Sequence, residues 1–162
     1  KKARVRVVYA RSMYAGASNA STALAGEFIG ILSAEDPAEV RCGLEAAVRY
    51  MEHEASFFSA NDDGSVVYFA HCISRTGSYL SKEAKVPEGT PMAYLIAPPL
   101  EAMLGLDAAV KAADVTLSLF YGPPTETNFA GGLLTGDQAA CKAACEAFAA
   151  TVCAIAAAPT AY

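Results

Sequence analysis

The sequence predicts an α+β fold in which helices cover one face of a mixed β-sheet. Short runs rich in β-branched and aromatic residues alternate with longer segments of helical apolar spacing. The order strand, loop, strand, capped helix also occurs twice along the chain. An apolar share of 54% over 162 residues is enough to build a hydrophobic core.

Composition argues against several classes of protein. The net charge is −5 and no basic stripe is present, so nucleic acid is not an expected partner. No apolar run reaches the roughly 18 residues that span a bilayer, and no signal peptide opens the sequence, so a membrane is not expected either. The five cysteines lack C-x-x-C spacing and fit free thiols in a reducing cytosol.

The first copy of the repeat spans Ala3–Met51. Its two strands are expected at Ala3–Ala10 and Gly26–Leu32, with a small, polar loop at Arg11–Thr22 between them. Asp36-Pro37 then caps and opens a helix. Charged residues occupy the opposite face, which predicts an amphipathic helix. Its apolar residues recur at helical spacing, and they are Val40, Leu44, Ala47, Val48 and Met51.

The remaining elements lie in an intervening segment and in the second copy. Strands are expected at Val66–Ile73, Met92–Ala97, Val115–Tyr121 and Phe129–Leu134. Helices are expected at Leu100–Ala113 and, after an Asp137 cap, through about Ile155. The core face of the last helix is predicted to consist of Cys141, Cys145, Phe148, Val152 and Ile155.

The repeat also predicts the division into domains. A strand–loop–strand–helix segment, from about Phe57 to Ala112, precedes the second copy, whereas only two residues precede the first. The first unit therefore looks short by about 55–60 residues if the two units are equal. We expect residues 1–54 to be the C-terminal part of a first domain and residues 55–162 to be a second domain.

The last part of the chain carries little charge. Residues 112–162 contain five charged side chains, namely Asp114, Glu126, Asp137, Lys142 and Glu146. Such a surface is unusual for a small monomer, so we expect other subunits to cover much of it.

Several runs, which together cover nearly the whole chain in order, resemble the EutL family of ethanolamine-utilisation shell proteins. These runs are VVYARSMYAGASNAST, LAGEFIGIL, SRTGSYLSKEA, MAYLIAPPLEAMLGLDAAVKAADV, PPTETNFAGGLLTG and QAACKAACEAFA.

The resemblance implies a tandem of two circularly permuted, ferredoxin-like microcompartment-shell domains, the first of them incomplete. Three chains would form a pseudohexameric tile that joins other shell proteins in the facets of a bacterial microcompartment in the cytoplasm. The family encloses cobalamin-dependent ethanolamine chemistry, so the small-molecule partner is ethanolamine, and ethanolamine or cobalamin is the candidate ligand. The expectation is a structural subunit with no catalytic residues, no metal and no resident cofactor.

Two loops occupy the same place in the two copies, between strand and strand, and they are Arg11–Thr22 and Gly122–Asn128. Equivalent loops meet around the axis of a threefold assembly. By resemblance, these loops line and gate a central pore. The pore residues would be Arg11, Ser12, Met13, Tyr14 and Gly16 in the first loop, and Pro123, Pro124, Thr125, Glu126 and Thr127 in the second.

A second candidate site concerns the substrate. Glu27 follows an Ala-Gly pair, at a place where the second copy has Gly132. Ethanolamine is a cation at neutral pH, and a carboxylate beside an aromatic ring suits an ammonium group. By resemblance, Glu27 and Phe57 lie at a small pore between the domains, with Asn128 as a weaker third candidate. The competing interpretations are a solvated rim charge for Glu27 and a core aromatic for Phe57.

An enzyme is the main rival class. A nucleophilic pair of Cys72 with His71 needs both side chains on one side, but adjacent strand residues point to opposite faces. Cys141 and Cys145 share a helix face, where core packing is favoured over metal binding. The alternative function that stays open is a small-molecule-binding regulator on the same scaffold.

Overall fold

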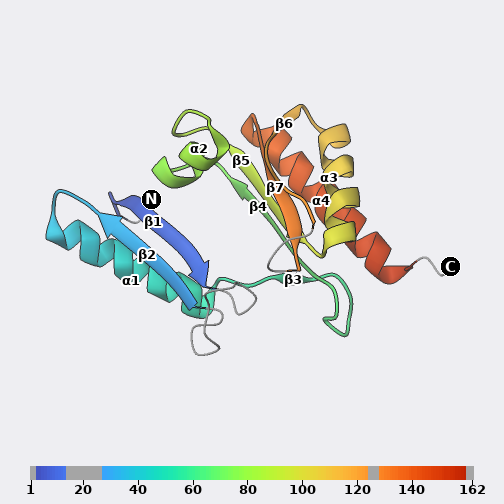
Figure 1. Ribbon diagram of the computed structural model, residues 1–162, viewed down its shortest axis with the longest axis horizontal. Coiled ribbons are helices and arrows are strands. Elements are labelled where there is room, and N and C mark those ends of the chain that lie inside the picture. Colours follow the sequence, from blue (N-terminus) through green and yellow to red (C-terminus); the bar gives the residue numbers. More distant parts are fainter. Residues whose placement is uncertain (1–2, 14–26, 124–127, 160–162) are drawn as a thin grey trace. The chain divides into compact units, whose positions relative to one another are not determined.

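The computed structural model describes residues 3–13, 27–123 and 128–159. Its chain divides into two compact units, which are described here one at a time (Figure 1). Unit 1 comprises Lys1–Ser56 with Gly77–Leu80, and unit 2 comprises Phe57–Thr76 with Ser81–Tyr162. The chain passes from unit 1 to unit 2 after Ser56, and the short segment Gly77–Leu80 returns to unit 1.

Unit 1 is a β-hairpin followed by a helix. Strand β1 (Arg6–Met13) pairs antiparallel with β2 (Glu27–Ser33). Helix α1 (Pro37–His53) begins where predicted, because the Asp36 carboxylate accepts a hydrogen bond of 2.8 Å from the backbone N–H of Ala38. Both strands and the capped helix are thus confirmed.

The apolar face of α1 is largely exposed, and only Val40 of its predicted residues is half-buried. Leu44, Val48 and Met51 are 46%, 52% and 52% exposed, and Gly43 is the one described residue of α1 that is buried. A Cβ atom on Gly43 would lie 2.8 Å from Val5 Cγ1, so the helix approaches its neighbours through this glycine. The described part of unit 1 has only one sheet layer, which half-buries Val5, Leu32 and Val40 and leaves most other apolar side chains exposed.

Unit 2 contains a five-stranded sheet in the order β3-β4-β5-β7-β6. Every strand pair in the described part of this sheet is antiparallel, so the expectation of a mixed sheet is wrong. The reason is the β6–β7 hairpin, which places β7 beside β5 in the opposite direction. The strands are β3 (Phe58–Ser59), β4 (Val67–Ile73), β5 (Met92–Ala97), β6 (Val115–Tyr121) and β7 (Ala130–Gly136).

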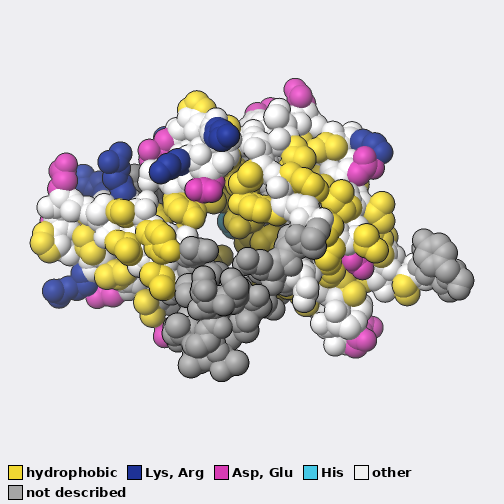
Figure 2. Space-filling view, in the orientation of Figure 1, with side chains coloured by type: hydrophobic (Ala, Val, Ile, Leu, Met, Phe, Trp, Pro, Cys, Tyr) yellow, Lys and Arg dark blue, Asp and Glu magenta, His cyan; other side chains and the backbone are white. Residues whose placement is uncertain are grey.

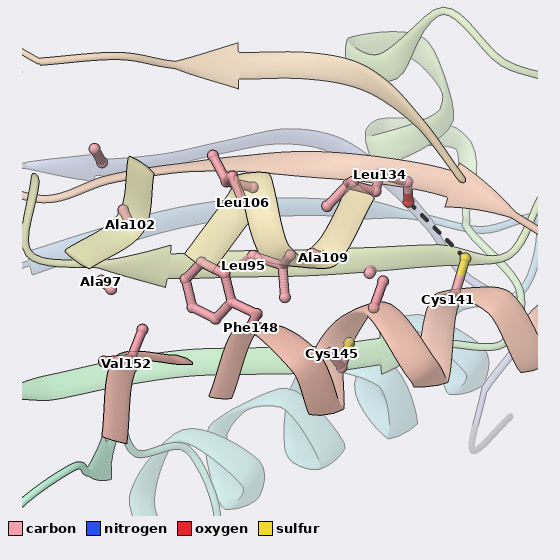
Figure 3. Close-up of a cluster of buried hydrophobic side chains, with 13 residues drawn as sticks. Leu95, Ala97, Ala102, Leu106, Ala109, Leu134, Cys141, Cys145, Phe148 and Val152 are labelled. Atoms are coloured by element: carbon pink, nitrogen blue, oxygen red, sulfur yellow. Dashed lines mark hydrogen bonds between the residues drawn. The ribbon is translucent and has the colours of Figure 1, made fainter. Parts of the chain in front are cut away.

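Helices α3 (Pro99–Ala112) and α4 (Gln138–Ala157) supply the second layer of unit 2. Phe148 projects from α4 into the core toward α3 and is completely buried (Figure 3). A Cβ atom on Gly105 would lie 2.7 Å from the Phe148 ring, so only glycine permits this close approach of α3. The predicted core face of α4 is confirmed for Cys141, Cys145, Phe148 and Val152, while Ile155 is half-buried.

By length and apolar composition alone, α4 is the one helix in the described residues that could cross a membrane. Its buried side chains belong instead to the hydrophobic core shared with β5, β7 and α3. Lys142 and Glu146 are both exposed within the same span. These are the properties of a core helix in a globular domain.

The structure contains two elements that the sequence did not predict. Helix α2 (Ser78–Ala84) has seven residues, too few for a clear helical period, and β3 has two. The other predicted strands and helices of unit 2 agree with the structure to within about two residues, the usual uncertainty of element boundaries.

Candidate functional site

The two hairpins that carry the candidate pore loops share one irregularity. In β1 the register shifts between Val7 and Tyr9, and in β6 it shifts between Leu117 and Leu119. Each shift is a β-bulge of one extra residue in the first strand of its hairpin, close to the end away from the loop. The two copies of the repeat inferred from the sequence therefore also share a β-bulge.

This bulge also corrects the alignment of the two copies. Leu32 pairs with Val7 just as Leu134 pairs with Leu117. Counted back from these leucines, Glu27 corresponds to Phe129 and not to Gly132. The Ala-Gly pair suggested a different alignment of the two copies. A match of two residues in a short run is weaker evidence for an alignment than the pairing of the strands.

The structure corrects the start of the first candidate pore loop. Arg11, Ser12 and Met13 belong to β1, where they pair with Ile29, Phe28 and Glu27. Their backbones are held in the hairpin ladder, so the small, polar composition placed the end of the strand too early. Tyr14 and Gly16 lie outside the described residues.

The second loop is described at its two ends. Pro123 is exposed, and Pro124, Thr125, Glu126 and Thr127 lie outside the described residues. At the first end, a Cβ atom on Gly122 would lie 2.5 Å from the ring of Phe120, so a larger residue here would require this 46% exposed ring to move. At the other end, Asn128 has φ of 58°, a left-handed conformation that asparagine tolerates better than most residues.

Phe57 belongs to an aromatic cluster of unit 2. Its ring stacks on Phe129, with centroids 5.4 Å apart, and meets the edge of Phe69 at 6.2 Å. Phe57 is nevertheless 46% exposed, so it is not a core aromatic. One of its ring contacts is therefore with the residue that follows Asn128, at the end of the second loop.

The cluster continues along the sheet on the side away from the core. Phe69 stacks on His71, with centroids 5.8 Å apart, and meets Tyr94 edge-on at 5.9 Å. His71 and Tyr94 are paired across β4 and β5. Sequence reasoning missed Phe69 and Tyr94 as companions of Phe57. Adjacent residues of a strand point to opposite faces, so the sequence of β4 could have predicted this grouping. Tyr68, Ala70 and Cys72 pack against the core, and the residues between them, Phe69 and His71, therefore share the other face.

Glu27 is the first residue of β2 and pairs with Met13 at the loop end of the hairpin. It belongs to unit 1, whereas Phe57 and Asn128 belong to unit 2. The structure brings Phe57 close to the end of the loop that contains Asn128, and Glu27 stays a separate candidate.

The residues considered for catalysis lie on different faces, as predicted. Cys72 packs against the core of unit 2, while the adjacent His71 is exposed beside Phe69. In the described part of the chain, no three side chains of His, Cys, Asp or Glu are arranged to hold a metal ion. Cys141 and Cys145 are buried core residues. Burial raises the pKa of Cys145 to about 12, and it also raises the pKa of Cys141.

Comparison with known proteins is informative once this geometry is established. No protein-family model matches the chain. The bacterial microcompartment shell protein EutL of Clostridium perfringens is 62% identical over 162 residues, which is all of this chain and 75% of the relative. EutL of Escherichia coli is 54% identical over 148 residues, covering 91% of this chain and 68% of the relative. The crystal structure of ethanolamine utilization protein EutL from Leptotrichia buccalis superposes with a TM-score of 0.86 at 66% identity, covering 99% of this chain and 74% of that one.

Proposed function

Because this chain belongs to the EutL family of bacterial microcompartment shell proteins, we propose that it is a non-catalytic, pore-forming tile of the ethanolamine-utilisation shell. The family places it in the microcompartment shell in the cytoplasm. In our proposal three copies form a pseudohexamer that packs beside other shell proteins in a facet. Two similar units per chain would give six units around the threefold axis.

The observation that carries this proposal is the uncovered apolar surface. Large apolar side chains are exposed in both units, and Figure 2 shows hydrophobic side chains gathered over β2 and α1 on the visible face. In unit 2 the exposed residues of α3 recur at helical spacing, and they are Leu100 at 74%, Met103 at 41%, Leu104 at 56% and Val110 at 38%. Monomeric proteins seldom leave such patches in water, whereas subunits of an assembly cover them.

The domain boundary is part of the same proposal. Residues 1–54 would be the C-terminal part of a first shell domain and residues 55–162 a second domain. The matching bulges in β1 and β6, and the aspartate caps of α1 and α4, support two related units. The chain spans about three quarters of the EutL relative from C. perfringens and about two thirds of that from E. coli.

The loops that leave the two bulged hairpins are proposed to line and gate the central pore. Asn128 stands at one end of the second loop, in a left-handed conformation that few residues other than glycine and asparagine adopt readily.

Solution mass tests the tile. Multi-angle light scattering of the purified chain should give a trimer, and negative-stain microscopy at higher concentration should show two-dimensional sheets. The same measurements are repeated on a chain extended to the full length of the EutL relatives. If only the extended chain assembles, the tile proposal holds and this chain lacks residues that assembly needs. A monodisperse monomer of the extended chain would overturn the tile and favour the small-molecule-binding regulator.

Ethanolamine is the proposed permeant, with Phe57 and Asn128 as contacts in unit 2 and Glu27 as a separate carboxylate. Phe57→Ala should weaken ethanolamine binding by about tenfold, since a cation over an aromatic face is stabilised by about 1–2 kcal/mol. Calorimetric titration of ethanolamine into the assembled protein measures this effect.

Phe58→Ala is the matched control for that titration. Phe58 is 52% exposed, close to the 46% of Phe57, but its ring contact is Tyr68 and not the end of the second loop. Glu27→Gln tests the carboxylate on its own and should also weaken binding. If Phe57→Ala and Phe58→Ala bind ethanolamine equally well, Phe57 is not a substrate contact.

A further inference from the structure

We propose that Cys72 and Cys141 form a redox pair, in which hydrogen peroxide oxidises Cys72 and Cys141 then closes a disulfide that ties β4 to α4. Both residues lie within unit 2. Neither takes part in the pore or substrate proposals. The pair therefore adds a chemical response to a subunit that is otherwise structural.

The geometry places the two thiols at the same contact between sheet and helix. The Cys72 thiol donates toward the carbonyl oxygen of Gln138, the first residue of α4, with Sγ and O 3.8 Å apart. Cys141 follows three residues later, on the same side of the first turn of the helix. In the sheet, Cys72 is paired with Ala93, and the Cys141 thiol interacts with the backbone N–H of Ala93.

Electrostatics agree with this proximity. Burial is the main reason why the pKa values of Cys141 and Cys145 are raised, and a negative charge on Cys72 raises both further. Such interactions between thiols require them to be close in a poorly solvated environment. Cys72 packs against the hydrophobic cluster that contains the other two.

The order of the two steps follows from burial. Cys72 is half-buried, so an oxidant can reach it, whereas Cys141 is completely buried. The Cys72 thiolate attacks one oxygen of the peroxide, so that an S–O bond forms, the O–O bond breaks and water leaves after protonation. The Cys141 sulfur then attacks Cys72, the S–S bond forms, and the hydroxyl of the sulfenic acid departs with the Cys141 proton as a second water. Two thiols are oxidised and one peroxide is reduced.

Cys141 is preferred over Cys145 as the partner. Cys145 lies one helical turn farther from Gln138, and its thiol, with a pKa of about 12, is the poorer nucleophile. Cys141 also has a raised pKa, so the second step should be slow compared with a solvent-exposed pair. The described residues contain no three-ligand arrangement for a metal, so metal binding does not compete as an explanation for this cluster.

Peptide mapping tests the pair directly. The full chain is reduced, freed of reductant and treated with hydrogen peroxide at neutral pH, then alkylated and digested without reductant. Mass spectrometry should find one linked pair of peptides that contain Cys72 and Cys141. The thermal unfolding midpoint of the oxidised chain should rise and should return on reduction, because the bridge closes the long loop between residues 72 and 141.

Three variants make the result specific. Cys72→Ala should lose both the linked peptide and the rise in midpoint, whereas Cys42→Ala, at an exposed position on α1, should keep both. Cys145→Ala should also keep the link. The proposal is overturned if Cys72 proceeds to sulfinic acid without a link, or if the linked peptides contain Cys145, Cys153 or Cys42 in place of Cys141. If a variant does not fold, the mapping of the unsubstituted chain still decides the pairing.

Discussion

At the scale of single residues, Phe57 differs most from what its sequence context suggests. A phenylalanine next to a predicted helix end is expected either in the core or in a ligand site. The structure shows a half-exposed ring held by Phe129 and Phe69. Contacts of this kind are worth about 0.5–1.5 kcal/mol beyond burial. The ring is therefore preorganised at the end of the second loop, which a contact in a binding site requires.

The buried thiol of Cys145 provides a pH-dependent prediction. Its pKa is about 12 in the folded chain, against about 9 for an ordinary thiol. Above pH 9 the unfolded chain loses this proton and the folded chain retains it, so the folded state binds more protons and stability falls with rising pH. The loss should be about 1 kcal/mol per pH unit between roughly pH 9 and 12.

Urea unfolding at several values between pH 8 and pH 11 measures this dependence. Cys145→Ala should flatten the decline, because the titrating group is gone, although the variant starts from a lower stability. Cys42→Ala removes an exposed thiol and serves as the control, which should leave the slope unchanged. Equal slopes for both variants would contradict the assignment to Cys145.

At the scale of elements, the helix starts show how local sequence fixes structure. Asp36 and Asp137 were predicted as caps, and both accept a backbone hydrogen bond from the first turn, from Ala38 at 2.8 Å and from Ala140 at 2.7 Å. A cap depends only on neighbouring residues, which is why it is readable without knowledge of the fold. The end of β1 was misread because the ladder with β2 overrides the propensity of Arg11–Met13.

Removing the cap of α4 should have a measurable cost. Asp137→Ala is expected to lower the free energy of unfolding by about 1 kcal/mol, because one backbone N–H of the first turn loses its acceptor. Asp137→Asn should recover most of the loss, since its side-chain oxygen accepts the same bond. Asp62→Ala, in the exposed turn after β3, is the control and should change stability by less than about 0.5 kcal/mol. Equal effects of the two alanine variants would mean that the cap is not energetically significant.

At the scale of the whole molecule, the two units differ in the size of their hydrophobic cores. The hydrophobic cluster of buried residues lies entirely in unit 2 and includes Leu95, Leu106, Leu134, Phe148 and Val152. In unit 1 the two strands and α1 leave Val8, Ile31 and Met51 more than half exposed. A two-stranded sheet with one helix has little capacity to stabilise itself in water.

This imbalance predicts different behaviour of the two parts. A fragment of residues 57–162 should fold alone and unfold cooperatively in urea, with the helical circular dichroism expected from α3 and α4. A fragment of residues 1–56 should show no cooperative transition. A cooperative transition in the shorter fragment would contradict the view that unit 1 depends on a covering partner.

The sequence by itself determined the longer strands and helices, both aspartate caps, most of the core face of α4 and the family. Each of these depends on neighbouring residues or on a pattern of fixed period, and the family depends on long runs of matching residues. The opposite faces of His71 and Cys72 were predictable for the same reason. The exposure of α1, the antiparallel sheet, the bulge that corrects the repeat and the companions of Phe57 depended on tertiary structure. These features arise from residues far apart in the chain, where strand pairing and the presence or absence of a covering layer decide the outcome.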